Sequence, residues 1–183
     1  MRIAVYCSAK DKIPEEYLAL GDKLGQWMAS AGQTLVYGGA TGGLMTHVSQ
    51  AVKQHGGEVI GVISQRIVEA NRQATNCDEL YSVQTLNERK QQMKDLADCF
   101  VCLPGSYGTI DEMMDVIASG TVGEHRKPIF VLNYQGYYEG LKQQADHMRQ
   151  LGFLPPVEQF APVFIDTLDE LISQLISIIH KNK

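Results

Sequence analysis

Short apolar segments alternate with longer amphipathic segments along most of the chain. The apolar segments are nearly continuous hydrophobic runs, a pattern typical of strands that are buried on both faces of a parallel sheet. They predict strands at residues 3–7, 34–37, 59–63, 80–83, 99–103, 129–132 and 163–165. The amphipathic segments repeat their apolar positions at helical spacing. They predict helices at residues 14–31, 44–55, 86–98, 109–119, 137–151 and 167–179.

Residues known to begin or end helices support these boundaries. Pro14 suits the start of the first helix, and Gly32 suits the position just after its end. Thr167 and Glu170 form a capping box before the last helix. Residues 64–78 are polar and irregular, so no element is predicted there. The alternation predicts an α/β fold with a mainly parallel, doubly wound sheet and helices on both faces.

Composition narrows the class of protein. The 183 residues contain no linker or repeat, so residues 1–183 are expected to form a single domain, and 44% hydrophobic residues suffice for its core. A net charge of −5 argues against a nucleic-acid partner. No apolar stretch reaches the about 18 residues of a membrane span, and residues 1–7 resemble a first strand rather than a signal peptide. We therefore expect a cytoplasmic protein without a membrane partner.

The four cysteines are interpreted as structural. Cys99 and Cys102 have the spacing of a redox pair, but they lie inside a predicted buried strand, whereas a redox pair sits at a helix N-terminus. No cluster of residues has the spacing of metal ligands, so no metal is expected.

The most informative segment is residues 104–112, Pro-Gly-Ser-Tyr-Gly-Thr-Ile-Asp-Glu, which follows the predicted strand 99–103. A strand, a glycine-rich break and a helix start direct free backbone N–H groups and the positive end of a helix dipole at one place, which suits a phosphate. Glu112 lies one turn into this helix, although anion binding needs no carboxylate. The combination indicates chemistry on a phosphorylated ligand. The alternative is that Glu112 only complements the helix dipole and Thr109 only caps the helix.

A second glycine-rich loop covers residues 38–43. Ligands of doubly wound sheets bind beyond the carboxyl ends of the strands, so this loop, the loop at residues 7–9 and the loop at 104–109 are expected to converge. The loop at 38–43 lacks the central glycine of a dinucleotide fingerprint, and the end of the next strand, near Ser64, offers no carboxylate. No Walker lysine occurs either. We therefore expect no nicotinamide cofactor and no triphosphate hydrolysis, and these glycines are equally compatible with simple turns.

The predicted helix 86–98 carries Arg89 and Met93 on one face. From there the Arg89 guanidinium would reach a ligand at the strand ends and bind a phosphate or a base edge. Spacing alone favours the alternative, an ordinary charged helix surface.

The segments Glu88-Arg89-Lys90-x-x-Met93 and 104–112 together resemble the LONELY GUY family, whose pattern is Pro-Gly-Gly-x-Gly-Thr-x-x-Glu after an Arg-Lys helix. Gly38-Gly39 and Gly43-Leu44-Met45 match its earlier part, and the similarity runs in order over roughly residues 1–155. The resemblance implies a Rossmann-like homodimer that hydrolyses the N-glycosidic bond of a nucleoside 5′-monophosphate, such as AMP or a cytokinin riboside 5′-monophosphate. Its products would be the free base and ribose 5-phosphate.

The resemblance also assigns roles. Arg89 and Glu112 would be catalytic, and no cofactor or metal would take part. The phosphate would be bound by the residues of the two glycine loops, Gly39, Thr41, Gly42, Gly105, Ser106, Gly108 and Thr109. Three further residues, Ser8, Met45 and Lys90, are candidate substrate contacts, although Met45 also suits the core. Members of the family have been labelled lysine decarboxylases, but nothing here is built for pyridoxal phosphate.

The chain departs from the family pattern at several positions. Ser106 replaces a glycine, the first loop reads Cys-Ser-Ala-Lys instead of Cys-Gly-Ser-Ser, and Ala40 replaces a third glycine. Residues 118–123 differ from a segment that shapes the pocket and dimer face in relatives, which leaves the preferred base open. Two alternatives therefore stay open, a non-catalytic nucleotide-binding or carrier protein of the same fold and an interaction protein.

Overall fold

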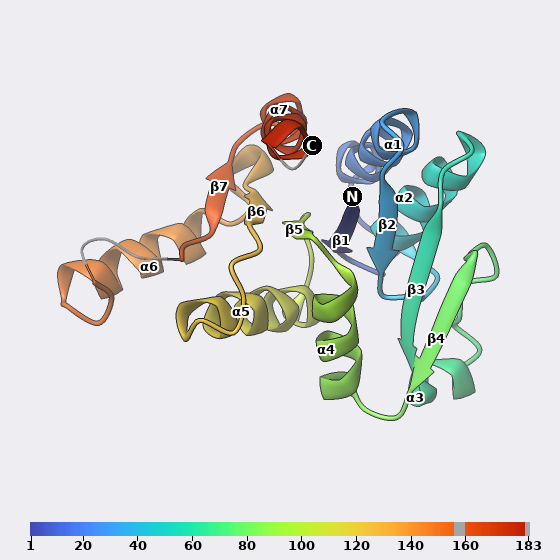
Figure 1. Ribbon diagram of the computed structural model, residues 1–183, viewed down its shortest axis with the longest axis horizontal. Helices are drawn as coiled ribbons and strands as arrows, with labels where there is room; N and C mark the ends of the chain where they lie inside the picture. The colour runs from blue at the N-terminus through green and yellow to red at the C-terminus, as the bar shows by residue number, and fades with distance from the viewer. Residues whose placement is uncertain (156–159, 182–183) are drawn as a thin grey trace.

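A computed structural model describes residues 1–155 and 160–181. Within these residues seven parallel strands form one sheet, in the order β4-β3-β2-β1-β5-β6-β7 (Figure 1). The strands are β1 (Arg2–Tyr6), β2 (Thr34–Tyr37), β3 (Val59–Ser64), β4 (Glu79–Val83), β5 (Cys99–Cys102), β6 (Ile129–Leu132) and β7 (Val163–Ile165). The sheet grows in one direction from β1 to β4 and in the other from β5 to β7. The order therefore reverses between β1 and β5, where ligands of such sheets bind.

Helices cover both faces of the sheet. The helices are α1 (Glu15–Ser30), α2 (Gly43–Gln54), α3 (Gln65–Glu69), α4 (Leu86–Leu96), α5 (Tyr107–Thr121), α6 (Glu139–Gln150) and α7 (Leu168–Lys181), with a 3₁₀ turn η1 (Tyr134–Gly136). In Figure 1, α1, α2 and α7 lie on one side of the central strands, and α4 and α5 lie on the other. This arrangement confirms the predicted α/β fold.

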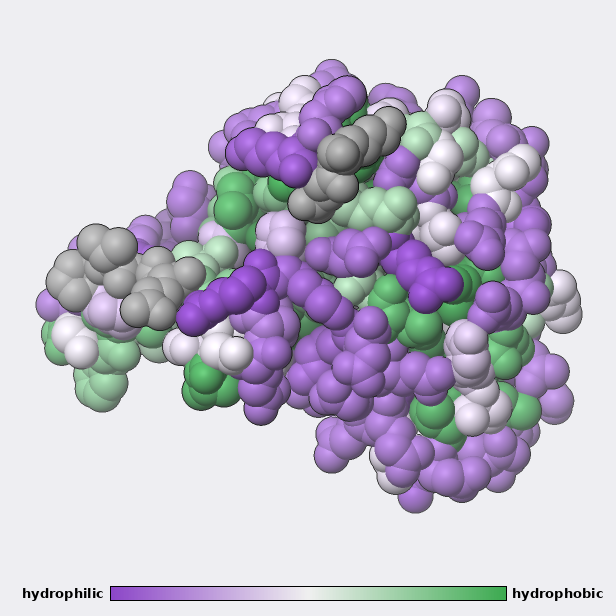
Figure 2. Space-filling model, viewed as in Figure 1, coloured by the Kyte–Doolittle hydropathy of each residue, from purple (hydrophilic) through white to green (hydrophobic). Residues whose placement is uncertain are grey.

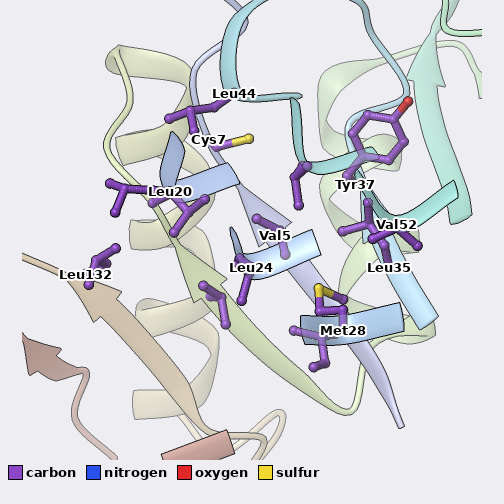
Figure 3. Packing of buried hydrophobic residues seen from close by; sticks show 14 of the residues in the cluster. Val5, Cys7, Leu20, Leu24, Met28, Leu35, Tyr37, Leu44, Val52 and Leu132 are labelled. Carbon is purple, nitrogen blue, oxygen red and sulfur yellow. The ribbon is translucent and has the colours of Figure 1, made fainter. Parts of the chain in front are cut away.

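Strand periodicity divides the core into two clusters. In β1, Ile3 and Val5 face α1, α2 and α7, whereas Ala4 and Tyr6 face α4 and α5. Figure 3 shows the first cluster, in which side chains from α1 and α2 pack on β1 and β2. Gly25 lets α1 approach α2 closely, because a Cβ there would lie 2.5 Å from the Val48 carbonyl oxygen. The face shown in Figure 2 is mostly polar, with separate apolar patches.

The structure confirms all seven predicted strands, corrects the start of two predicted helices and adds one helix that was not predicted. The irregular segment 64–78 contains α3, which is too short and too polar to leave a periodic signal. Helix α5 begins at Tyr107 instead of residue 109, so Ser106 and not Thr109 is the N-cap residue. Helix α6 begins at Glu139 instead of residue 137, after η1.

Several local predictions agree with the structure. Gly32 follows α1 with a φ of +64°, a conformation that favours glycine. The Thr167 hydroxyl accepts a hydrogen bond from the Glu170 amide at 3.2 Å. Cys99 and Cys102 are buried in β5, and burial raises the pKa of Cys99 to about 12, as expected of a structural thiol. Among the described residues no helix has the length and apolarity needed to cross a bilayer.

Candidate active site

The loops after β1, β2 and β5 meet at the carboxyl edge of the sheet, as the sequence predicts. The Ser8 amide donates to the Pro104 carbonyl at 3.3 Å and joins the first loop to the third. The Met45 amide donates to the Ser8 carbonyl at 3.2 Å and joins α2 to the first loop. The Gly43 amide donates to the Asp11 carboxylate at 2.9 Å. The edge is thus a connected set of loops rather than three independent turns.

A cavity of about 200 Å³ opens among these loops. Its lining comes from all three loops, from α2, α3, α4 and α5 and from the segment after α3: Cys7, Ala9, Ala40, Met45, Ile67, Arg72, Leu86, Arg89, Ser106, Gly108, Thr109 and Glu112. Both predicted catalytic residues, Arg89 and Glu112, therefore lie in one cavity, together with the predicted contacts Met45, Ser106, Gly108 and Thr109.

Arg89 and Glu112 form a buried ion pair in this cavity. Arg89 is 6% exposed and Glu112 is 5% exposed. The Arg89 Nη1 donates to Glu112 Oε1, and its Nε donates to the Val62 carbonyl oxygen of β3 at 2.9 Å. Two elements that are separate in sequence, α4 and α5, thereby place a cation and a carboxylate against each other. Such charge-assisted contacts hold both side chains in fixed positions.

Local structure explains why Arg89 points inward. Thr85 caps α4, since its hydroxyl accepts a hydrogen bond from the Glu88 amide at 3.1 Å. This start puts Arg89 and Met93 on the buried face, as predicted. Gly38 provides the space for the guanidinium, because a Cβ on residue 38 would lie 2.0 Å from Arg89 Nη2. A glycine in a loop predicted to bind phosphate therefore makes room for the side chain of Arg89.

The protonation of Glu112 depends on two opposing effects. Burial raises the pKa of Glu112 above its ordinary value, because the charged form loses solvation. The adjacent Arg89 opposes this rise by stabilising the carboxylate. A buried carboxylate with a raised pKa is a better proton acceptor than an ordinary surface glutamate.

The N-terminus of α5 is open toward the cavity. Ser106 is the N-cap residue, and its side chain makes no capping hydrogen bond. The first amides of a helix have no partner within the helix, so this end presents N–H donors and the positive end of the dipole. Ser106 has a φ of −90°, which any residue adopts, so replacing the family's glycine by serine strains nothing.

The remaining residues of this loop differ in exposure. Gly108 is exposed, and a Cβ there would meet no atom within 4 Å. Thr109 is 3% exposed. Gly105 is buried behind the cavity, and it is needed for packing because a Cβ there would lie 2.1 Å from Thr109 Oγ1.

The second glycine loop lies beside the cavity, with its amides engaged in other bonds. The Thr41 amide donates to the Arg72 carbonyl at 2.8 Å, and the Gly42 amide donates to Thr46 Oγ1 at 2.7 Å. Gly39 and Gly42 have φ angles of +65° and +111°, so the chain needs glycine at both. The structure does not place Gly39, Thr41 or Gly42 in the cavity lining.

Ser8 and Lys90 also lie outside the lining. The Ser8 hydroxyl accepts a hydrogen bond from the Lys10 amide at 3.1 Å within the first loop. Lys90 points away from Arg89 and pairs with Asp111 at 3.0 Å and Asp115 at 3.6 Å. These ion pairs hold α4 against α5 and so support the geometry of the Arg89–Glu112 pair.

Arg72 is the charged lining residue that sequence reasoning missed. It lies in the segment 64–78, where no element was predicted, and its place depends on pairing between distant segments. Ala40 and Gln73 form an isolated antiparallel bridge, and the Ala74 amide donates to the Gly39 carbonyl at 2.8 Å. No periodic or motif signal marks such a bridge. A cationic residue between two strand ends was the available clue.

Known proteins resemble this chain over most of its length. A sequence profile of a family described as "possible lysine decarboxylase" matches residues 45–175. The chain is similar to a cytokinin riboside 5′-monophosphate phosphoribohydrolase of Mycobacterium marinum, at 37% identity over 170 residues, which cover 93% of this chain and 90% of the relative. A cytokinin riboside 5′-monophosphate phosphoribohydrolase of Arabidopsis thaliana is 36% identical over 174 residues, 95% of this chain and 76% of the relative.

Solved structures share the fold. The Moco carrier protein of Chlamydomonas reinhardtii superposes with a TM-score of 0.73 at 19% identity and 98% coverage of both chains. A molybdenum cofactor binding protein of Rippkaea orientalis gives a TM-score of 0.72 at 20% identity, with 97% of this chain and 96% of that chain covered. At these identities the likeness shows a common fold and carries no functional argument.

Proposed function

The chain belongs to the LONELY GUY family, and from this membership and its site we propose that it is a nucleoside 5′-monophosphate phosphoribohydrolase. It hydrolyses the N-glycosidic bond of AMP or a cytokinin riboside 5′-monophosphate and releases the free base and ribose 5-phosphate. The observation that carries the proposal is the buried Arg89–Glu112 pair in a cavity beside the open N-terminus of α5.

The reaction needs a carboxylate near the sugar. As the bond between C1′ and the base nitrogen lengthens, positive charge develops on the ribose as in an oxocarbenium ion. The Glu112 carboxylate stabilises that charge and accepts a proton from the attacking water. The water oxygen bonds to C1′, and the electron pair of the broken bond leaves with the base, which takes up a proton.

Arg89 keeps Glu112 ready for this role. Its guanidinium opposes the effect of burial on the carboxylate, and its bond to the Val62 carbonyl fixes the position of the pair. Catalysis depends on such preorganised charges, because they cost no reorganisation during the reaction. Arg89 also lines the cavity, where its charge offsets the negative charge of the leaving base.

The 5′-phosphate binds at the start of α5, against Ser106, Gly108 and Thr109. Helix N-termini bind phosphate through free amides and the helix dipole. Gly105 admits the Thr109 side chain behind this site, and the second glycine loop, which contains Gly39, Thr41 and Gly42, borders the cavity through Ala40. Met45 contributes an apolar surface to the cavity.

We further propose that the protein forms a homodimer through α5 and the start of α4. Four large apolar side chains are exposed there, Leu86 at 56%, Tyr107 at 90%, Met114 at 41% and Val122 at 75%. A helix face of this kind is typical of an interface with a second copy. We also propose a cytoplasmic location, which accords with four free cysteines.

The experiment is to incubate the purified protein with AMP and with isopentenyladenosine monophosphate and to quantify free base chromatographically. We expect release from at least one substrate, and a fall of about 10³-fold in kcat for Glu112→Gln. The matched control is Glu15→Gln, which makes the same change at an exposed glutamate in the first turn of α1, outside the cavity lining. It should stay within about twofold of wild type.

The alternative function is a non-catalytic nucleotide-binding or carrier protein of the same fold. The altered first loop and Ser106 are the features that favour it. Nucleotide binding without any base release from either substrate would establish the carrier function. Release that persists undiminished in Glu112→Gln would overturn the assignment of the catalytic carboxylate.

A further inference from the structure

Arg72 carries a charge that the fold leaves without a carboxylate partner. Its side chain donates from Nη2 to the Thr41 carbonyl at 3.3 Å and to the Ala9 carbonyl at 3.4 Å. Both contacts are at the long end of the hydrogen-bond range and are therefore weak. In the described residues no carboxylate oxygen lies within ion-pair distance of this guanidinium. The cation is held loosely between the first and second loops.

The backbone of Arg72, by contrast, is firmly held. Its carbonyl accepts hydrogen bonds from the Thr41 amide at 2.8 Å and from Thr41 Oγ1 at 3.2 Å, and its amide donates to the Ile67 carbonyl at 3.2 Å. The adjacent residue, Gln73, pairs with Ala40. A rigid base and an exposed side chain with weak contacts allow the guanidinium to turn toward a ligand at little cost.

The charges of the cavity lining indicate what kind of ligand Arg72 would contact. The charged lining residues are Arg72, Arg89 and Glu112, and the last two neutralise each other. Arg72 is therefore the unbalanced charge of the cavity. The same lining includes the open N-terminus of α5, in a protein whose net charge is −5. A site with local positive charge favours the binding of an anion, even on a protein that is acidic overall.

We propose that Arg72 is a substrate-binding residue whose guanidinium binds the 5′-phosphate from the side opposite α5. This inference rests on the proposed function for the identity of the substrate. The planar guanidinium suits two phosphate oxygens at once, and the helix amides hold the third. Arg72 thereby selects nucleoside 5′-monophosphates over unphosphorylated nucleosides, and it contributes binding rather than chemistry.

The test compares Arg72→Gln and Arg72→Lys with wild type on AMP and on adenosine. For Arg72→Gln we expect KM for AMP to rise about 10- to 100-fold with kcat nearly unchanged, because a charge-assisted contact is lost. Hydrolysis of adenosine should not change. Arg72→Lys, which keeps the charge without the planar fork, should give an intermediate KM. The matched control is Arg66→Gln on α3, an exposed arginine that does not line the cavity.

Binding of ribose 5-phosphate, measured by calorimetry, separates this inference from the proposed function. Weaker binding in Arg72→Gln supports the phosphate contact even if wild type releases no base, which would overturn only the proposed reaction. Wild-type affinity in Arg72→Gln, an equal change for AMP and adenosine, or a loss confined to kcat would overturn the inference. Thermal unfolding of both variants identifies a loss caused by misfolding, and Arg72→Lys then provides the deciding measurement.

Discussion

Replacing Gly38 by alanine is expected to disable the site by adding one methyl group. Gly38 follows β2, and its φ lies outside the positive range, so alanine strains no backbone there. The new Cβ, however, would lie 2.0 Å from Arg89 Nη2, 3.2 Å from Arg89 Cζ and 2.9 Å from Met45 Cε. Unbonded carbon and nitrogen atoms need about 3.5 Å, so the guanidinium must move by more than about 1 Å.

Arg89 has no free path for this movement. Its Nε is bonded to the Val62 carbonyl and its Nη1 to Glu112, and both residues of the pair are buried. Displacement weakens at least one charge-assisted bond, each worth about 1.5–3 kcal/mol. We expect the free energy of unfolding to fall by that amount. We expect kcat/KM to fall about 100-fold, because a misplacement of about 1 Å in a catalytic group has an effect of this size.

The assay is base release from AMP combined with unfolding in urea. The matched control is Gly140→Ala on α6, where a Cβ meets no atom within 4 Å, so stability should hold or rise and activity should not change. In a double-mutant cycle, Gly38→Ala should add little to Arg89→Ala, since both act through the same guanidinium. Wild-type activity in Gly38→Ala, or fully additive losses in the cycle, would refute the reasoning.

Three further predictions concern the phosphate site, the carboxylate and the core. Gly108→Ala should fold as stably as wild type or better, because the new Cβ meets open space and alanine favours a helix. The same Cβ should crowd the phosphate and weaken AMP binding in calorimetry. An unchanged affinity would contradict a phosphate site at the start of α5. In the pH profile of kcat/KM, the midpoint of the acidic limb should lie above the ordinary glutamate pKa of about 4.3. The reason is that burial raises the pKa of Glu112 and that the carboxylate must be ionised to act. Arg89→Gln should move that limb to still higher pH, and a limb that stays in place would contradict the coupling of the pair. Gly25→Ala should lower the free energy of unfolding by about 1–3 kcal/mol in urea titrations, because the new Cβ would clash with the Val48 carbonyl oxygen. A stability equal to that of wild type would show that α1 and α2 can move apart without cost.

The fold could be predicted from the sequence because buried strands and amphipathic helices each have their own pattern of apolar residues. The buried strands are continuous apolar runs, and α1 and α7 carry clear stripes that end up in the core. Helix α3 left no such signal, since it is five residues long and none of them is buried. The start of α5 was misplaced because Thr109 resembles a cap, whereas the helix begins at Tyr107.

The site was predictable where one motif determines local geometry, and unpredictable where distant segments meet. Glu112 and Arg89 were identified from the family pattern, and the structure brings them together. Gly38 lies in a loop that was predicted to bind phosphate, and Gly105 was itself predicted to contact the phosphate. In the structure the lack of a Cβ at these two glycines also accommodates the side chains of Arg89 and Thr109. Spacing alone cannot distinguish a glycine that admits a ligand from one that admits a neighbouring side chain.

The Arg89–Glu112 pair resolves the conflict between an anion site and an acid. A free carboxylate beside the N-terminus of α5 would compete with the phosphate for the helix dipole and would repel it. Arg89 neutralises that charge at the point where it arises, and its bond to Val62 fixes the pair on β3. In the proposed reaction the helix amides and Arg72 are then left for the phosphate. A single ion pair would thus allow one cavity to bind an anion and to stabilise a developing cation on the sugar.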